Sequence, residues 1–228
     1  MDTHTRFVQQ VAEVARSMQD ASGTQQTLDE VVSMAPELIH GCDLVGISIV
    51  TPDGIDTPAG TDEALNRIDE LQFEMREGPC FDALEMHERI HSRDLATDTR
   101  WPRWGPHVAR EIGVVSVVSY RLFTTADSLG ALNLYSRTSE AFDLDDIDNG
   151  EALAAHVAVA LASSRKAEQL GVAITTRTVI GQAEGILMER FDISADQAFA
   201  VLRRVSSHSN VKLNRVAEQL VRTRETPT

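Results

Sequence analysis

The sequence predicts an α+β protein in which an antiparallel sheet with flanking helices is followed by a long connecting helix and an all-α domain of three helices. Short β-branched runs occur in pairs that are joined by turns, which is typical of β-hairpins. Apolar residues at helical spacing lie on both sides of these runs and continue through the last third of the chain. Strands that pair as hairpins between helices favour an antiparallel sheet.

The N-terminal part is expected to begin with two helices, at residues 7–19 and 28–39, the second with Thr24 as its cap and Gly41 at its end. A segment that is helix or loop is expected at residues 64–77, and a further helical turn at residues 81–87. The expected strands are residues 44–50, 55–59, 89–95, 114–123 and 129–135. A loop with two Trp at residues 98–106 is expected to enter a helix that includes Val108, Ala109 and Ile112.

A long helix is expected next, because an Ala-rich helical pattern at residues 146–169 continues into a second one at residues 175–190. Gly181 and Gly185 lie inside the second stretch. Each costs about 1 kcal/mol of helix propensity relative to Ala, so a neighbouring segment is expected to press against them. Two interpretations of the long helix stay open: it covers its own sheet, or it is a signalling stalk that also dimerises.

The C-terminal part shows a clear helix start, because Ser194 and Gln197 have the spacing of a capping box. The apolar stripes of the last two helices are Ala198, Phe199, Leu202 and Val205, then Leu213, Val216, Ala217, Leu220 and Val221. So small a unit cannot hold a large core alone. We therefore expect the preceding helix to complete its core.

The formal net charge of −14 is divided unevenly along the chain. Residues 165–228 hold ten Lys/Arg and seven Asp/Glu, whereas the other 164 residues hold eleven Lys/Arg and twenty-eight Asp/Glu. A negatively charged body repels polyanions, so any contact with nucleic acid is expected from the basic C-terminal part.

The cellular setting suggested by the sequence is the cytoplasm. No charged-then-apolar segment of a secretory signal is seen at the start, and no run of about 18 apolar residues could span a membrane. Cys42 and Cys80 are too few for a disulfide framework. Each is either a core thiol or a free thiol sensor, and the core is favoured because no basic neighbour clearly lowers a thiol pKa.

Two motifs are candidates for chemical sites. Residues 87–91, HERIH, match the zinc pattern H-E-x-x-H, but in a strand the two His would lie about 13 Å apart, so the match is interpreted as accidental and no metal is expected. Trp101 and Trp104 could form a ligand platform, although packing of a loop on the sheet is favoured. Phosphate loops, dinucleotide fingerprints and nucleophile elbows are absent from the sequence. We therefore expect no cofactor and no enzymatic activity.

A cationic surface is the strongest functional feature of the last two helices. Lys212, Arg215 and Arg222 share one helix face with Gln219, opposite the apolar stripe. Arg203, Arg204 and Ser207 lie on the exposed side of the preceding helix, and Asn210 lies in the turn between the two helices. Such a surface suits phosphates and unpaired base edges, but on charge spacing alone a solvated helix face is the favoured interpretation.

The C-terminal part resembles the ANTAR domain, the three-helix RNA-binding module of bacterial transcription antiterminators. The resemblance covers about residues 165–223 and rests on Arg177, Ile180 to Ala183, Gly185 to Arg190, Ala198, Phe199, Leu202, Arg203, Ser206, Val216 and Ala217. It implies an RNA-binding role for the cationic surface and adds Arg177 to the candidate contacts. The predicted RNA-binding residues are Arg177, Arg203, Arg204, Ser207, Asn210, Lys212, Arg215 and Arg222.

The N-terminal part resembles a GAF sensor domain of the type coupled to ANTAR in actinobacteria. The resembling stretches are residues 77–80, 94–95, 100–102, 113–116, 129–135 and 141–142. The resemblance implies a central antiparallel sheet, a homodimer and a small-molecule ligand that it does not name. The predicted domains are a GAF sensor at residues 1–164 and an ANTAR RNA-binding domain at residues 165–228.

Together these resemblances imply an RNA-binding regulator of transcription antitermination, in which the GAF domain takes an input and the ANTAR domain binds stem-loops in nascent mRNA. Two alternatives stay open. The chain could be a small-molecule sensor whose C-terminal helices serve dimerisation or protein interaction, or the tail could bind DNA as a helix-turn-helix-like module.

Overall fold

The computed structural model describes residues 13, 16, 23–51, 54–86, 89–124 and 128–225. The helix expected at residues 7–19 therefore lies outside the described residues, apart from Glu13 and Arg16. The chain divides into two compact units, Met1–Arg165 and Lys166–Thr228.

The described elements alternate helices and strands in the first unit and are all helical in the second. They are α2 (Thr24–Leu38), β1 (Leu44–Thr51), β2 (Gly54–Gly60), α3 (Ala64–Met75), α4 (Pro79–Met86), β3 (Ile90–Ser92), α5 (Trp104–Glu111), β4 (Ser116–Phe123), β5 (Ser128–Ser136), α6 (Leu144–Phe191), α7 (Ala195–Ser209) and α8 (Leu213–Thr223). The predicted α+β class with an antiparallel sheet, a long helix and C-terminal helices is confirmed.

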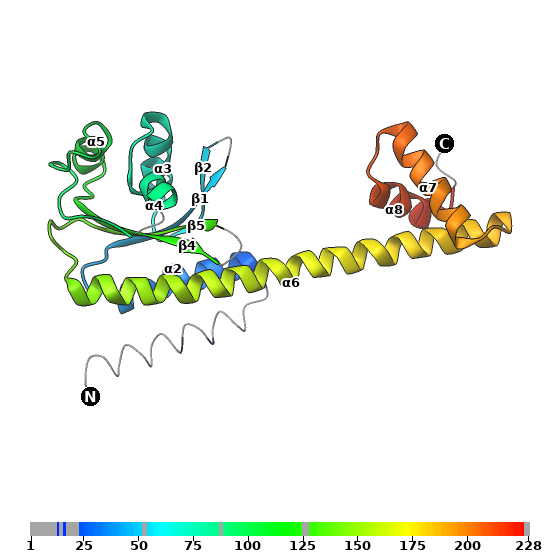
Figure 1. The fold of residues 1–228 in the computed structure, drawn as a ribbon, viewed down its shortest axis with the longest axis horizontal. Coiled ribbons are helices and arrows are strands. Elements are labelled where there is room, and N and C mark those ends of the chain that lie inside the picture. Colours follow the sequence, from blue (N-terminus) through cyan, green and yellow to red (C-terminus); the bar gives the residue numbers. More distant parts are fainter. Residues whose placement is uncertain are drawn as a thin grey trace. The chain divides into compact units, whose positions relative to one another are not determined.

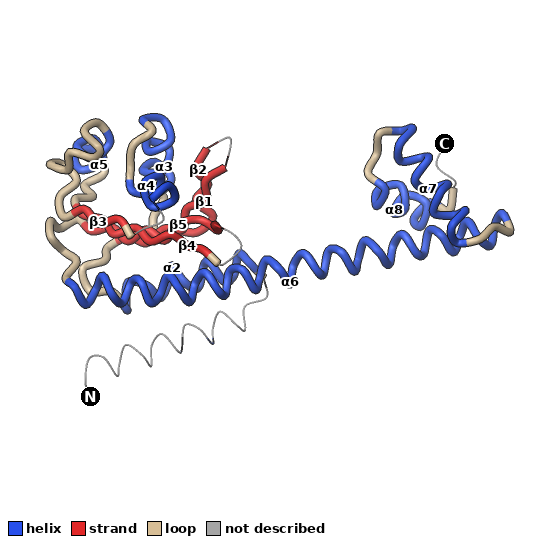
Figure 2. Tube along the Cα trace, viewed as in Figure 1, coloured by secondary structure: helices blue, strands red, loops and turns tan. Residues whose placement is uncertain are grey.

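The sheet of the first unit has the strand order β2-β1-β5-β4-β3, and every neighbouring pair is antiparallel. Helices cover both of its faces (Figures 1 and 2). On β4, Val118, Tyr120 and Leu122 are buried with α2 and the first part of α6, whereas Val117 is buried with α3, α4 and α5. Burial on both faces explains why residues 116–120 of β4 are all buried rather than alternately buried and exposed.

The ends of α2 differ from the expectation. Thr24 is the first residue of the helix rather than its cap, because Gly23 occupies the N-cap position. The helix ends at Leu38, and Gly41 lies in the turn that follows, with φ 45°. A side chain at Gly41 would collide with the carbonyl oxygen of Ala141, so the close approach and the positive φ both require glycine there.

The loop expected at residues 98–106 is shorter than the sequence suggested. Trp104, Gly105 and Pro106 form the first turn of α5. Proline is tolerated in a first helical turn because its missing N–H would have no intrahelical partner there. The segment at residues 64–77, left as helix or loop, contains the helix α3, and α4 begins at Pro79.

Helix α6 is continuous through 48 residues, as the adjoining helical patterns predicted. Its first part buries Leu153, Val157 and Leu161 in the core of the first unit. The expectation that a neighbour presses against Gly181 and Gly185 is wrong. Apart from the adjoining residues and the backbone of α6 itself, no described atom lies within 4 Å of a Cβ built at either glycine, because both lie on the exposed side of α6.

The second unit is a small bundle of the last part of α6 with α7 and α8 (Figure 1). Its buried residues are Ala183, Leu187, Ala198, Leu202, Val216, Ala217 and Leu220. The first two come from α6, so the preceding helix completes this core as expected. The predicted capping box is present: the Ser194 hydroxyl accepts from the Gln197 N–H at 3.3 Å, and the Gln197 side chain accepts from the Ser194 N–H at 2.9 Å.

Candidate nucleic-acid interface

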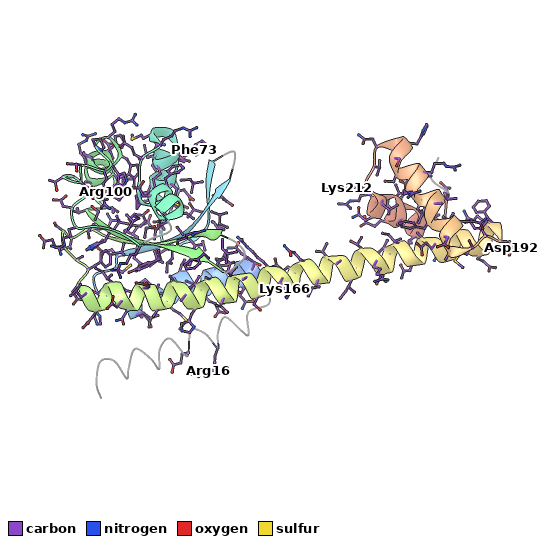
Figure 3. All side chains as sticks on the ribbon, in the orientation of Figure 1. Arg16, Phe73, Arg100, Lys166, Asp192 and Lys212 are labelled. Carbon is purple, nitrogen blue, oxygen red and sulfur yellow. The ribbon has the colours of Figure 1, made fainter. Side chains whose placement is uncertain are left out.

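The basic face predicted for the last helix is present on the surface of the second unit. Arg215 and Arg222 lie on α8 and are exposed, whereas Val216, Ala217 and Leu220 on the same helix are buried. Lys212 is also exposed and occupies the N-cap position, one residue before α8 begins. Figure 3 shows Lys212 in the connection between α7 and α8.

Helix α7 contributes a second exposed row. Arg203, Arg204 and Ser207 are exposed, and the buried residues of α7 lie on its other side at Ala198 and Leu202. The row ends at the turn into α8, which the Ser206 hydroxyl stabilises by donating to the Val211 carbonyl at 2.6 Å.

Asn210 has a backbone role in this turn. It ends α7 with φ 53°, in the left-handed region that Asn tolerates better than most residues. Its N–H donates to the Ser206 carbonyl, and its side chain is exposed. The exposed amide therefore lies in the turn two residues before Lys212, and backbone hydrogen bonding helps to fix that turn.

The charges of this surface are only weakly engaged within the protein. Arg215 donates from Nη1 to Glu218 Oε2 at 2.9 Å, and both side chains are exposed. In the part of the chain that the structure describes, no ion pair is found for Lys212, Arg203, Arg204 or Arg222. Because an exposed pair contributes only about 0–1 kcal/mol, a phosphate can replace Glu218 at Arg215 at small cost.

Arg177 stands apart from the other predicted contacts. It is exposed on α6, six residues before the first core residue of the second unit, Ala183. With a rise of 1.5 Å per residue, that separation is about 9 Å along the helix axis. The structure thus brings seven of the eight predicted residues onto α7, α8 and their connection, and leaves Arg177 on the third helix.

A groove between α6 and α8 was not identified from the sequence. It has a volume of about 880 Å³ and is lined by Gln182, Gly185, Ile186, Glu189, Arg190, Val221 and Arg224. We call it the α6–α8 groove. Arg190 donates from Nη2 to the Arg224 carbonyl at 2.5 Å, which ties the end of α8 to α6. The only sequence signal was the recurrence of polar residues at Gln182 and Glu189 around a glycine.

The first unit contains a buried polar layer between the sheet and α3. The Asp69 carboxylate accepts hydrogen bonds from the hydroxyls of Ser48 at 2.5 Å and Thr57 at 2.7 Å, and from the Gln72 amide at 2.6 Å. Burial raises the pKa of Asp69, although these three donors counteract the rise. The fully buried Tyr135 hydroxyl has no hydrogen-bond partner among the described residues.

The alternative sites gain no support from the geometry. Burial raises the pKa of the Cys42 thiol to about 12 and that of Cys80 still further, so neither is poised as a reactive thiolate. Trp101 and Trp104 are buried with their ring centroids 5.5 Å apart, which confirms loop packing rather than a ligand platform.

The zinc-like pattern receives no support in the described residues. His91 lies in β3, as expected, while His87 and Glu88 lie outside the described part of the chain. Over the described ranges, no group of three or more His, Cys, Asp or Glu side chains is placed to hold a metal ion.

These features define a class of protein: an antiparallel sheet domain with flanking helices, joined through one long helix to a compact helical module with a basic surface. Family comparisons agree with both parts. The sequence profile of the GAF domain matches residues 21–162, and that of the ANTAR domain matches residues 168–221. The chain belongs to the GAF domain family and has the GAF–ANTAR architecture that the sequence resemblance predicted. A comparison with curated proteins finds no match.

Solved structures support the fold of the first unit. The GAF domain of a phosphoenolpyruvate-protein phosphotransferase from Coxiella burnetii is 17% identical, with a TM-score of 0.58 over 72% of this chain and 96% of its own. Free methionine-R-sulfoxide reductase from Neisseria meningitidis is 16% identical, with a TM-score of 0.57; the match covers 73% of this chain and 95% of the reductase chain. The photosensory core module of a Stigmatella aurantiaca phytochrome is 12% identical, with a TM-score of 0.60; the match covers 89% of this chain and 44% of the phytochrome chain.

At such identities the likeness concerns the fold alone. The family assignments point to a sensor domain followed by a module of the RNA-binding antitermination type. None of the helices in the described ranges has the length and apolar character that a membrane crossing requires.

Proposed function

We propose that the chain is a regulator of transcription antitermination, in which the surface of α7 and α8 binds the loops of stem-loops in nascent mRNA. The observation that carries the proposal is the exposed basic row of Lys212, Arg215 and Arg222, continued by the exposed arginines of α7. Base edges in a loop are unpaired and accessible, and phosphates around them can meet lysine and arginine without a duplex groove.

The input is proposed to enter through the GAF domain and to reach the RNA-binding surface through α6. This helix supports the proposal because it contributes buried residues to the cores of both units. The small-molecule ligand of the GAF domain has no assigned identity. The proposal gives the chain no catalytic reaction, since the likeness to a sulfoxide reductase extends only to the fold.

A homodimer is the second part of the proposal. Leu170 and Ile174 on α6 are 56% and 67% exposed, and Gly181 and Met188 follow Ile174 at successive intervals of seven residues. Apolar residues at that spacing are typical of a helix that packs against another helix. The same row supports the alternative function, in which the C-terminal helices serve dimerisation or protein interaction without RNA, so RNA binding itself must be measured.

The test uses the full chain and a pool of RNA stem-loops with fixed stems and randomised loops. Wild type is expected to bind, with log affinity falling against log salt by about 0.7 per phosphate contact. Lys212→Ala or Arg215→Ala should weaken binding by about tenfold and lower that slope by about one contact.

Arg110→Ala is the matched control for Arg215→Ala. Arg110 lies in the first unit, its side chain is 69% exposed against 71% for Arg215, and it is likewise paired with a glutamate. It should leave RNA binding unchanged. Binding that is indifferent to both variants of the C-terminal unit would disprove the site, and a preference for duplex DNA would favour a DNA-binding module instead.

A further inference from the structure

The α6–α8 groove has a lining that the basic face does not share. Ile186 and Val221 are half-buried and present apolar atoms, while Gln182 and Glu189 present an amide and a carboxylate from α6. The guanidinium of Arg190 is anchored by its hydrogen bond to the Arg224 carbonyl. An apolar wall with a few convergent polar groups is the usual composition of a small-ligand site.

Gly185 is the second feature of the groove that favours a ligand site. It lines the groove, and a Cβ built there meets no described atom within 4 Å. Glycine costs about 1 kcal/mol relative to Ala inside a helix, and no neighbour in the described structure makes it necessary for packing. Its effect is to leave the backbone of α6 bare at the floor of the groove, so that a flat ring can approach it.

The chemistry of the lining favours a nucleobase over a phosphate. The Glu189 carboxylate forms no ion pair within the described residues and would repel a phosphate. The lining also holds Arg190 and Arg224, but the Arg190 guanidinium is already hydrogen-bonded to the Arg224 carbonyl. A carboxylate accepts N–H donors, and side chains that recognise single-stranded RNA read the base edges in this way. The groove also adjoins the basic face, because Val221 is followed directly by Arg222.

We propose that the α6–α8 groove receives one unpaired base of the RNA loop, with the ring over Gly185 and Ile186 and an amino-bearing edge at Glu189. This inference rests on the proposed RNA-binding function and adds a base-reading site to the phosphate-binding face. Guanine, adenine and cytosine carry an exocyclic amino group on the Watson–Crick edge, whereas uracil has there only a ring N–H that is flanked by two carbonyl oxygens, which a carboxylate repels. The groove therefore selects against uracil at one loop position.

Two matched variants of the full chain test the groove. Gly185→Leu fills it, and Gly171→Leu places the same side chain fourteen residues earlier on α6, equally free of neighbours and outside the groove lining. Circular dichroism should show both variants folded, since Leu favours a helix over Gly. With stem-loops enriched from the pool by the wild type, Gly185→Leu should weaken binding by about tenfold or more, the size of one base contact, and Gly171→Leu should not. Equal affinity for Gly185→Leu and wild type, or equal losses in both variants, would overturn the inference.

Glu189→Gln provides an independent readout. It keeps the shape of the side chain but replaces the carboxylate with an amide that can also donate. Wild type is expected to lose about tenfold in affinity when uracil replaces the read base, and Glu189→Gln should lose much of that discrimination.

A preference against uracil that is unchanged in Glu189→Gln would count against the carboxylate contact.

Failure of the inference is distinguishable from failure of the proposed function. A wild type that binds no stem-loop refutes RNA binding altogether. A wild type that binds and responds to Lys212→Ala, but not to Gly185→Leu, refutes only the groove.

Discussion

The cores of the two units differ in kind. The first unit buries two apolar clusters, one on each face of its sheet, and places large side chains such as Trp101, Trp104 and Tyr135 in full burial. The second unit buries only alanine, leucine and valine side chains, and half-buried residues surround them. A small core of this kind leaves most of the surface of α7 and α8 exposed.

The difference teaches where each unit can be altered. Substitutions inside the first unit should cost folding free energy, whereas exposed positions of the second unit can be changed with little effect on folding. The units can be followed separately, because all Trp and Tyr residues lie before residue 136. Tryptophan fluorescence therefore reports the first unit alone, whereas circular dichroism reports the helices of both units.

Trp104→Ala should have the largest effect, lowering the free energy of unfolding of the first unit by roughly 3–5 kcal/mol. Trp104 is fully buried, its Nε1 donates to the Ile68 carbonyl at 3.3 Å, and it packs edge-on against Trp101. Denaturant unfolding followed by the fluorescence of Trp101 measures the loss. Trp104→Phe, which keeps most of the buried area, should cost clearly less. Equal stability of Trp104→Ala and wild type would contradict the description of this core.

Asp69→Ala should come next, at about 2–3 kcal/mol, because it leaves buried donors of Ser48, Thr57 and Gln72 without their acceptor. The pH dependence of Asp69→Asn is the sharper measurement. Burial raises the folded-state pKa of Asp69 above its unfolded value of about 3.9. The contribution of Asp69 to stability is thus fully present below that value and declines as the pH rises through the folded-state pKa.

Wild type should accordingly lose stability relative to Asp69→Asn as the pH rises above about 4, and the gap should become constant once Asp69 is fully ionised in the folded protein. Urea unfolding at a series of pH values, followed by tryptophan fluorescence, gives this difference. A gap that is the same at every pH would show that Asp69 titrates alike in the folded and unfolded chain.

Ser194→Ala should have the smallest effect, about 1 kcal/mol on the second unit, because it removes the capping box at the start of α7. Ser209→Ala is the matched control at the other end of the same helix. The Ser209 hydroxyl only donates to the Val205 carbonyl one turn back, and the change should be near neutral. Thermal unfolding by circular dichroism compares them, and equal shifts in both variants would refute the role of the cap.

Local patterns predicted most of the fold for a physical reason. Strand β4 and the apolar stripes of α7 and α8 depend on residues close in sequence, and the Ser194 capping box is contained within four residues. The start of α5 was missed because Gly105 and Pro106 resemble loop residues when their place in a first helical turn is unknown. The role of Gly181 and Gly185 was misjudged because propensity cannot tell which side of a helix faces a neighbour.

The candidate site likewise has one part that the sequence predicted and one part that it did not. Exposure of Lys212, Arg215 and Arg222 followed from their spacing against a buried stripe, which helix geometry alone dictates. The α6–α8 groove could not be predicted in this manner, because Gln182 and Glu189 meet Val221 from a helix more than thirty residues away. Such a meeting depends on how three helices pack, which no single periodicity records.

One consequence concerns how the C-terminal unit could be transplanted. Ala183 and Leu187 belong to α6, so a hairpin of α7 and α8 taken by itself would leave Leu202 and Leu220 facing solvent. A C-terminal unit that is moved to another protein must therefore include the last part of α6. Any new N-terminal partner must therefore deliver that helix in the right rotational phase, since each inserted residue turns everything beyond it by about 100°.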